Sequence, residues 1–80
     1  MNFTVYSKDG CPYCTQVKRV LDLCNFKYQE YKLDEHFDRF AFYEEFGGNA
    51  TFPQILLNNK KLGGVTDTVK YLKEHNFINY

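Results

Sequence analysis

The segment Cys11-Pro12-Tyr13-Cys14 sets two cysteines three residues apart, after an apolar run and before a helical pattern. Pro12 suits the first position of a helix, because the N–H that proline lacks would be unpaired there. A helix beginning at Pro12 makes Cys11 and Cys14 neighbours, with Cβ atoms roughly 5–6 Å apart. A disulfide needs about 3.5–4.5 Å, a gap that small local adjustments close. The positive end of the helix dipole favours a thiolate at Cys11. We therefore interpret the pair as a redox couple.

The composition restricts the class of protein. Eighty residues form one domain, 1–80, near the lower size limit for a self-sufficient core. Ten basic and ten acidic residues give a net charge of zero, which argues against binding to nucleic acid or to an anionic membrane. There is no apolar run of the roughly 20 residues that a membrane span needs, and no signal-peptide pattern. Three cysteines, an odd number, argue against a purely structural disulfide framework. We expect a monomeric, cytoplasmic protein whose cysteines do chemistry.

Residue patterns predict the element order β-α-β-α-β-β-α. We expect strands at 2–7, 26–33, 54–58 and around 61–62, and helices at 12–24, 34–46 and 65–75. The first β-α-β implies parallel strands with a right-handed crossover, and the turn at 58–60 implies a hairpin. An α/β fold with a four-stranded mixed sheet and helices on both faces follows. The charges within 26–33 favour a place near the sheet edge.

The second helix is the least clearly bounded element. Asp34 is the expected N-cap, and Gly47-Gly48-Asn49 is expected to end the helix. Its buried face is predicted to contain Phe37, Phe40, Ala41 and Phe46.

Two further motifs are Thr51-Phe52-Pro53 and Gly63-Gly64-Val65-Thr66-Asp67. With the cysteine pair, in this order and spacing, they resemble a dithiol glutaredoxin over nearly the whole chain. The resemblance implies a thioredoxin-like fold and a glutathione-dependent thiol–disulfide oxidoreductase. Its substrates would be protein disulfides and protein–glutathione mixed disulfides, with ribonucleotide reductase as one client protein. Glutathione would be the co-substrate and the Cys11–Cys14 disulfide the redox group, with no permanent cofactor and no metal.

The resemblance also assigns roles at the cysteine pair. Cys11 is the expected nucleophile, and Cys14 resolves the mixed disulfide formed on Cys11. Pro12 shapes the loop, and the Tyr13 ring is expected against bound glutathione. Lys8 either adds positive charge near Cys11 and glutathione or is a solvated loop lysine.

The second motif is expected to hold the backbone of glutathione. In the family the bond before Pro53 is cis, so that the backbone of Phe52 pairs with an extended peptide. Thr51 belongs to the same binding loop. Phe52 stands where the family commonly has valine, which is expected to alter the groove.

The third motif is expected to hold the γ-glutamyl end of glutathione. Backbone N–H groups at a helix N-terminus suit a carboxylate, and Asp67 can accept from an ammonium group. By the resemblance Thr66 and Asp67 bind this end, and Gly63 and Gly64 are structural. Asp67 could instead be a simple helix cap.

Some residues are left with open roles. Arg39 is a candidate for the glycyl carboxylate of glutathione, although the sequence does not give its direction. Cys24 is expected to be a buried, inert thiol rather than a regulatory one. His36 and His75 are expected to face solvent.

Three alternative functions have a basis in the sequence. A zinc site would need four ligands, but Cys24, His36 and His75 stand in no motif spacing. An iron–sulfur carrier resembles the single-cysteine branch, from which Pro12 and Cys14 depart. A redoxin served by thioredoxin reductase stays open, although the predicted Thr66–Asp67 pocket favours glutathione.

Overall fold

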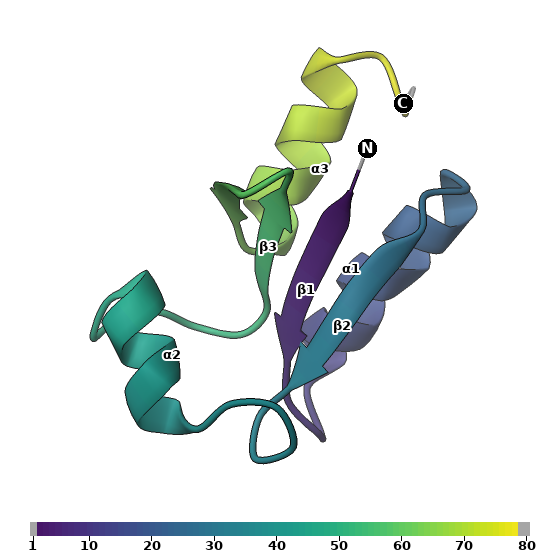
Figure 1. Ribbon diagram of the computed structural model, residues 1–80. Coiled ribbons are helices and arrows are strands. Elements are labelled where there is room, and N and C mark those ends of the chain that lie inside the picture. The colour runs from purple at the N-terminus through teal and green to yellow at the C-terminus, as the bar shows by residue number, and fades with distance from the viewer. Residues whose placement is uncertain (1, 79–80) are drawn as a thin grey trace.

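The computed structural model describes residues 2–78 and has the predicted element order (Figure 1). The strands are β1 (Phe3–Ser7), β2 (Tyr28–Lys32), β3 (Gln54–Leu57) and β4 (Lys60–Gly63), and the helices are α1 (Pro12–Leu23), α2 (Arg39–Phe46) and α3 (Val65–Glu74). No helix within residues 2–78 combines the length and the apolar character needed to cross a membrane.

The four strands form one mixed sheet in the order β2-β1-β3-β4. β1 pairs in parallel with β2, and β3 runs antiparallel to both β1 and β4. β2 therefore lies at an edge, as its mixed composition predicted. Asn58 and Asn59 join β3 to β4 with φ angles of 51° and 75°. Positive φ at both central residues is what a tight two-residue hairpin needs, so the predicted hairpin is confirmed.

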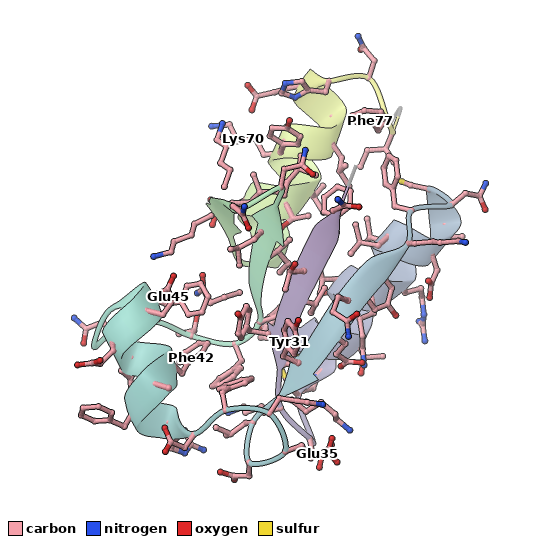
Figure 2. All side chains as sticks on the ribbon, viewed as in Figure 1. Tyr31, Glu35, Phe42, Glu45, Lys70 and Phe77 are labelled. Atoms are coloured by element: carbon pink, nitrogen blue, oxygen red, sulfur yellow. A yellow bond between two sulfur atoms is a disulfide. The ribbon has the colours of Figure 1, made fainter. Side chains whose placement is uncertain are left out.

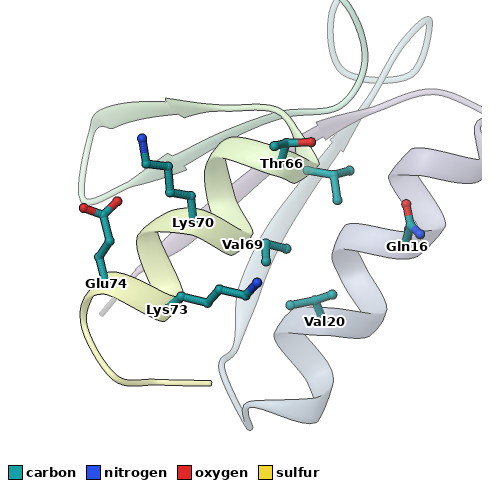
Figure 3. A pocket seen from close by; sticks show the side chains of 8 residues that line it. Gln16, Val20, Thr66, Val69, Lys70, Lys73 and Glu74 are labelled. Carbon is teal, nitrogen blue, oxygen red and sulfur yellow. The ribbon is translucent and has the colours of Figure 1, made fainter. Parts of the chain in front are cut away.

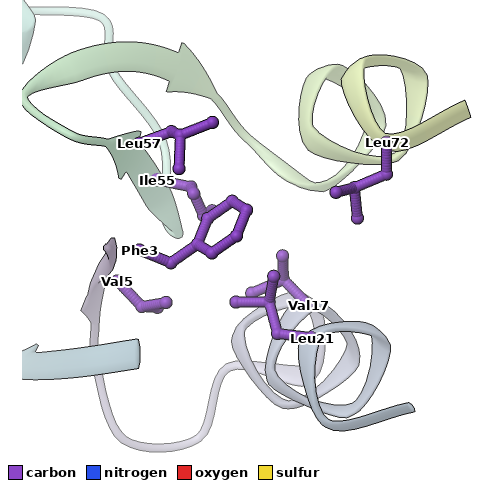
Figure 4. Packing of buried hydrophobic residues seen from close by; sticks show 7 residues of the cluster. All are labelled: Phe3, Val5, Val17, Leu21, Ile55, Leu57 and Leu72. Carbon is purple, nitrogen blue, oxygen red and sulfur yellow. The ribbon is translucent and has the colours of Figure 1, made fainter. Parts of the chain in front are cut away.

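The main core lies between the sheet and the helices α1 and α3. Side chains from β1 and β3 meet side chains from these two helices, as Figure 4 shows; the cluster consists of Phe3, Val5, Val17, Leu21, Ile55, Leu57 and Leu72. Alternate residues of a strand point to opposite faces, so Tyr6 points away from this core. Its ring contacts Phe37 and Phe46, with centroids 5.2 and 5.0 Å away. α2 thus covers the opposite face, and the prediction of helices on both faces is confirmed.

The predicted start of the second helix was wrong. The N-cap is Asp38, whose side chain accepts a hydrogen bond from the N–H of Ala41 at 2.9 Å. Asp34 has a φ of 69° and belongs to a turn that precedes the helix. A bridge between Leu33 and Phe37 holds this turn closed, which delays the helix by one turn.

The predicted buried face of this helix was wrong for Phe40 and Ala41. Phe40 is 73% exposed, and Ala41 is also exposed. Phe42, at 1% exposure, is the buried residue and lies between α2 and the sheet in Figure 2. Phe46, four residues later on the same face, and Phe37, before the helix, are half-buried. We call Tyr6, Phe37, Phe42, Phe46 and Phe52 the aromatic cluster.

A polar contact ties α1 to the edge strand. The Ser7 hydroxyl donates to Glu30 Oε2 at 2.6 Å, and Lys18 Nζ lies 2.9 Å from the same oxygen. Burial raises the pKa of Glu30, but the hydrogen bonds from Ser7 and Lys18 and the positive charges of Lys18 and Lys32 together hold that pKa below its ordinary value. The carboxylate therefore stays charged in the folded protein and joins β1, β2 and α1.

Candidate active site

The cysteine pair lies at the N-terminus of α1. Cys11 is the N-cap residue in extended conformation, and Pro12 is the first helical residue. Cys11 and Cys14 form a disulfide with Cα atoms 5.2 Å apart, so the predicted pairing is confirmed. The N–H of Cys14 also points at Cys11 Sγ, 3.2 Å away. In the reduced protein this donor and the helix dipole stabilise negative charge on Cys11.

The two sulfurs differ in access. Cys11 is 8% exposed and Cys14 is 2% exposed. An incoming disulfide therefore reaches Cys11 first, whereas Cys14 can attack only a sulfur already attached to Cys11. The burial pattern agrees with the predicted roles of nucleophile and resolving cysteine.

The loop with Thr51, Phe52 and Pro53 flanks the disulfide. The Phe52–Pro53 peptide bond is cis, as expected, and Pro53 is fully buried. Thr51, Phe52 and Pro53 line a groove of about 320 Å³, which we call the cis-proline groove. Tyr13 lines the end of this groove beside the disulfide, and Thr66 and Asp67 line the far end. Segments distant in the sequence therefore form one continuous groove.

The far end of the groove is the first turn of α3. The N–H of Gly64 donates to Asp67 Oδ2 at 3.3 Å, so Asp67 does act as a helix cap. Gly63 has a φ of 113°, and a Cβ atom at this position would collide with the Asp67 carboxylate. Thr66 is exposed at the helix N-terminus, where backbone N–H groups of the first turn lack intrahelical partners. These donors and a carboxylate beside them suit a ligand that carries both a carboxylate and an ammonium group.

A second hollow of about 340 Å³ lies on the other side of Tyr13. Cys11, Lys8 and Phe52 line it, together with Arg39 and Tyr43 of α2. Arg39 therefore faces the site, which the sequence left open. Lys8 Nζ lies 5.3 Å from the centroid of the Phe52 ring, so its ammonium group is held beside the disulfide rather than in a remote loop.

Tyr43 and Gln54 are two of the lining residues that the sequence reasoning missed. Tyr43 lies one helical turn beyond Arg39 on the same face of α2, so a correct start for this helix would have predicted it. Gln54 lines the cis-proline groove, and its side-chain amide donates to the carbonyl of Thr51 at 2.8 Å. No pattern in the sequence marks Gln54, because its role depends on the path of the loop before β3.

Phe52 connects the site to the aromatic cluster. Its ring stacks on Phe42 with centroids 4.0 Å apart and planes inclined by 9°. The Phe37 ring also stacks on both, with its centroid 6.3 Å from that of Phe52 and 5.9 Å from that of Phe42. The larger side chain at position 52 therefore packs into the core under α2, where it anchors the binding loop.

The remaining candidates lie away from this site. Cys24 is a half-buried free thiol beside the main core, less buried than predicted. His36 and His75 are exposed, as predicted. In residues 2–78 no three His, Cys, Asp or Glu side chains are grouped so that they could hold a metal ion.

Comparison with known proteins identifies a related family. The Glutaredoxin family model matches residues 3–62. The chain is 33% identical to Glutaredoxin 1 of Rickettsia prowazekii over 72 residues, covering 88% of this chain and 76% of that protein. Reduced Escherichia coli glutaredoxin superimposes with a TM-score of 0.80 at 25% identity, over 98% of this chain and 100% of that one. A buckwheat glutaredoxin solved in complex with glutathione gives a TM-score of 0.79 at 26% identity, over 94% and 71% of the two chains.

Proposed function

This chain belongs to the glutaredoxin family and is a thiol–disulfide oxidoreductase, and we propose that it takes its electrons from glutathione. The observation that carries the proposal is the cis-proline groove, which runs from Tyr13 beside the disulfide to the first turn of α3 and is called the glutathione groove from here on. Its volume of about 320 Å³ lies within the range of small-ligand sites, roughly 300–1,000 Å³. The buckwheat relative, solved with glutathione bound, supports the same ligand.

Each part of glutathione has a matching group in the site. The backbone of the Thr51–Phe52 loop faces the cysteinyl residue, and the N–H groups of the first turn of α3 receive the γ-glutamyl carboxylate. The Asp67 carboxylate has two oxygens, so it accepts from the γ-glutamyl ammonium while it caps Gly64. Lys8 and Arg39 receive the glycyl carboxylate in the second hollow.

The reaction with a mixed disulfide uses one cysteine. The Cys11 thiolate attacks the glutathione sulfur, a Cys11–glutathione disulfide forms, and the client thiolate leaves and takes a proton. A second glutathione thiolate then attacks the glutathione sulfur of that adduct. Glutathione disulfide leaves, and the Cys11 thiolate is restored.

The reaction with a protein disulfide uses both cysteines. Cys11 attacks one client sulfur and expels the other as a thiolate, which takes a proton. Cys14 then attacks Cys11 Sγ, which releases the second client thiol and leaves the Cys11–Cys14 disulfide. Two glutathione molecules reduce that disulfide and leave as one glutathione disulfide. Ribonucleotide reductase, which is reduced at a disulfide, is a client that we propose on the resemblance alone.

The testing experiment is glutathione-coupled reduction of a small mixed disulfide by the wild type and three variants. We expect activity in the wild type, none in Cys11→Ser and substantial activity in Cys14→Ser. Cys24→Ser is the matched control and stays active, because this thiol is half-buried beside the main core. A wild type that is inactive with glutathione but is reduced by thioredoxin reductase would overturn the proposal.

The binding geometry has its own test in Asp67→Asn. Asparagine keeps an oxygen for the Gly64 cap but removes the charge that faces the glutathione ammonium. We expect the KM for glutathione to rise about tenfold, the size of one lost charge-assisted hydrogen bond. The control is Asp22→Asn, on the exposed side of α1. Equal KM values for glutathione in the two variants would show that the Asp67 charge does not bind glutathione.

A further inference from the structure

A separate hollow runs between α1 and α3, and its volume of about 610 Å³ exceeds that of either hollow beside the disulfide (Figure 3). Its floor is formed by Val20 of α1 and by Val65 and Val69 of α3. All three valines are half-buried, so they leave an apolar strip open between the two helices. We call this hollow the α1/α3 groove.

The α1/α3 groove continues the glutathione groove. Val65 and Thr66 line both hollows, so one begins where the other ends. Gln16 lines the α1/α3 groove on the α1 side and also borders the hollow beside Tyr13. A chain that lies in the glutathione groove and passes Thr66 therefore enters the α1/α3 groove directly.

The charges around the α1/α3 groove favour an acidic occupant. Lys70 and Lys73 line it together with Glu74, and Figure 3 shows the Lys73 side chain reaching across toward α1. Arg19 lines the adjoining hollow that shares Gln16. The groove itself thus has two basic groups and one acidic group, Arg19 adds a third positive charge on the α1 side, and Asp67 lies in the glutathione groove beyond Thr66.

We propose that the α1/α3 groove binds the polypeptide segment next to the reactive cysteine of a disulfide-bonded client protein. That segment carries a small apolar side chain for the valine floor and an acidic side chain for Lys70 and Lys73. The inference rests on the proposed function, because it needs client backbone in the place that glutathione otherwise takes. It applies to protein disulfides only, since in a glutathione mixed disulfide the glutathione moiety itself fills the glutathione groove.

The helix geometry sets the spacing in the client. The γ-glutamyl residue of glutathione precedes its cysteine, so the client residue near Thr66 is also the one before the cysteine. Thr66 and Lys73 are seven residues apart on α3, a rise of about 10 Å. About three extended residues cover that distance. The acidic side chain is therefore expected roughly four to five residues before the client cysteine.

The experiment uses two synthetic peptides, each with an intramolecular disulfide. One carries aspartates four and five residues before the reactive cysteine. The other carries them four and five residues after it. The test variant is Lys70→Glu/Lys73→Glu, its control is Lys27→Glu on the loop after α1, and Glu74→Lys is the reciprocal change. All of these positions are exposed, so the variants are expected to fold.

The expected result is selective. For the first peptide, kcat/KM falls about tenfold in the double variant, rises two- to threefold in Glu74→Lys and stays unchanged in Lys27→Glu. A tenfold change corresponds to about 1.4 kcal/mol. The effect shrinks as salt is added, because the groups are exposed. The second peptide and the small mixed disulfide are unaffected by any of these changes.

The failures of the two proposals are distinguishable. If the wild type does not reduce the small mixed disulfide with glutathione, the proposed function fails. If it does, but the double variant reduces both peptides as fast as the wild type, the groove does not bind the client. An equal loss with both peptides would show a general charge effect and would also overturn the inference.

Discussion

Phe42 and Phe40 lie two residues apart on α2 and have opposite environments. Phe42 is 1% exposed and contacts the rings of Phe37, Phe46 and Phe52, whereas Phe40 is 73% exposed. Replacing each by alanine in turn removes the same atoms from the same helix. Any gain in helix propensity is shared by the two variants, so their difference measures burial alone.

The size of that difference follows from the contacts. Truncating a buried phenylalanine typically costs about 3–5 kcal/mol of unfolding free energy. Phe42 stacks on Phe52 at 4.0 Å, and an aromatic pair adds about 0.5–1.5 kcal/mol beyond area. We expect Phe42→Ala to lose about 3–4 kcal/mol and Phe40→Ala to stay within about 0.5 kcal/mol of the wild type. In a domain of this size the larger loss lowers Tm by roughly 12–30 °C.

The assay is urea and thermal unfolding followed by circular dichroism. A domain of this length is expected to have roughly 4–12 kcal/mol of stability, so Phe42→Ala falls close to the limit of folding. Phe42→Leu, expected to lose about 1–2 kcal/mol, keeps the comparison measurable if the alanine variant is unfolded. Equal stabilities of Phe42→Leu and Phe40→Leu would refute the placement of the buried face.

Three further predictions concern the turn before α3, the edge contact and the free thiol. Gly63→Ala is expected to lose at least about 1–2 kcal/mol and to weaken glutathione binding, because its Cβ would displace the Asp67 carboxylate and its φ is 113°. Glu30→Gln is expected to lose about 1 kcal/mol at neutral pH and to flatten the fall in stability on acidification, measured by urea unfolding at several pH values. The sign follows from the lowered pKa of Glu30: its contribution is full above the unfolded value near 4.5 and disappears as pH falls through the lower folded pKa. Cys24→Ser is expected to keep glutathione-coupled activity within about twofold at a stability cost of about 1 kcal/mol.

Each of these has a control or a contradicting outcome. Gly48→Ala meets no atoms within 4 Å and should be tolerated; an equal loss there would show that the effect at Gly63 is not steric. Glu45→Gln removes a more exposed ion pair with Lys61 and should leave the fall in stability on acidification unchanged. If the free energy of unfolding falls equally on acidification in the wild type and in Glu30→Gln, this carboxylate is not the cause of that fall. A loss of activity in Cys24→Ser would place that thiol in the reaction.

Features that depend on a few adjacent residues were predicted correctly from the sequence. Pro12 begins α1, so that Cys11 and Cys14 come together on one turn. The helix predicted at 12–24 ends at Leu23 with Cys24 as its C-cap, and the next residue, Asn25, has a φ of 59°, a conformation that asparagine tolerates better than most residues. Such features are local, because backbone angles, caps and i to i+3 contacts require nothing from the rest of the chain.

Arg39 shows what the sequence could not decide. Its position on a helix was predicted, but its direction depends on where α2 begins and how that helix turns against the sheet. The turn closed by Leu33 and Phe37 moved the helix start to Arg39, and with it the face that meets the site. Phe40 was predicted to be buried but is exposed, and Phe42 is buried instead, since a single helical turn carries aromatic residues on several sides.

By itself the sequence determined the redox pair, the order of elements and the hairpin, and the resemblance pointed to the glutathione loop and the first turn of α3. Only the tertiary structure decided which phenylalanines are buried, that Phe52 packs on Phe42, and that the groove beyond Thr66 continues between α1 and α3. The physical reason is that burial and grooves arise where segments far apart in the chain meet. Local preferences set each segment's conformation, whereas the packing of helices against the sheet sets what each side chain faces.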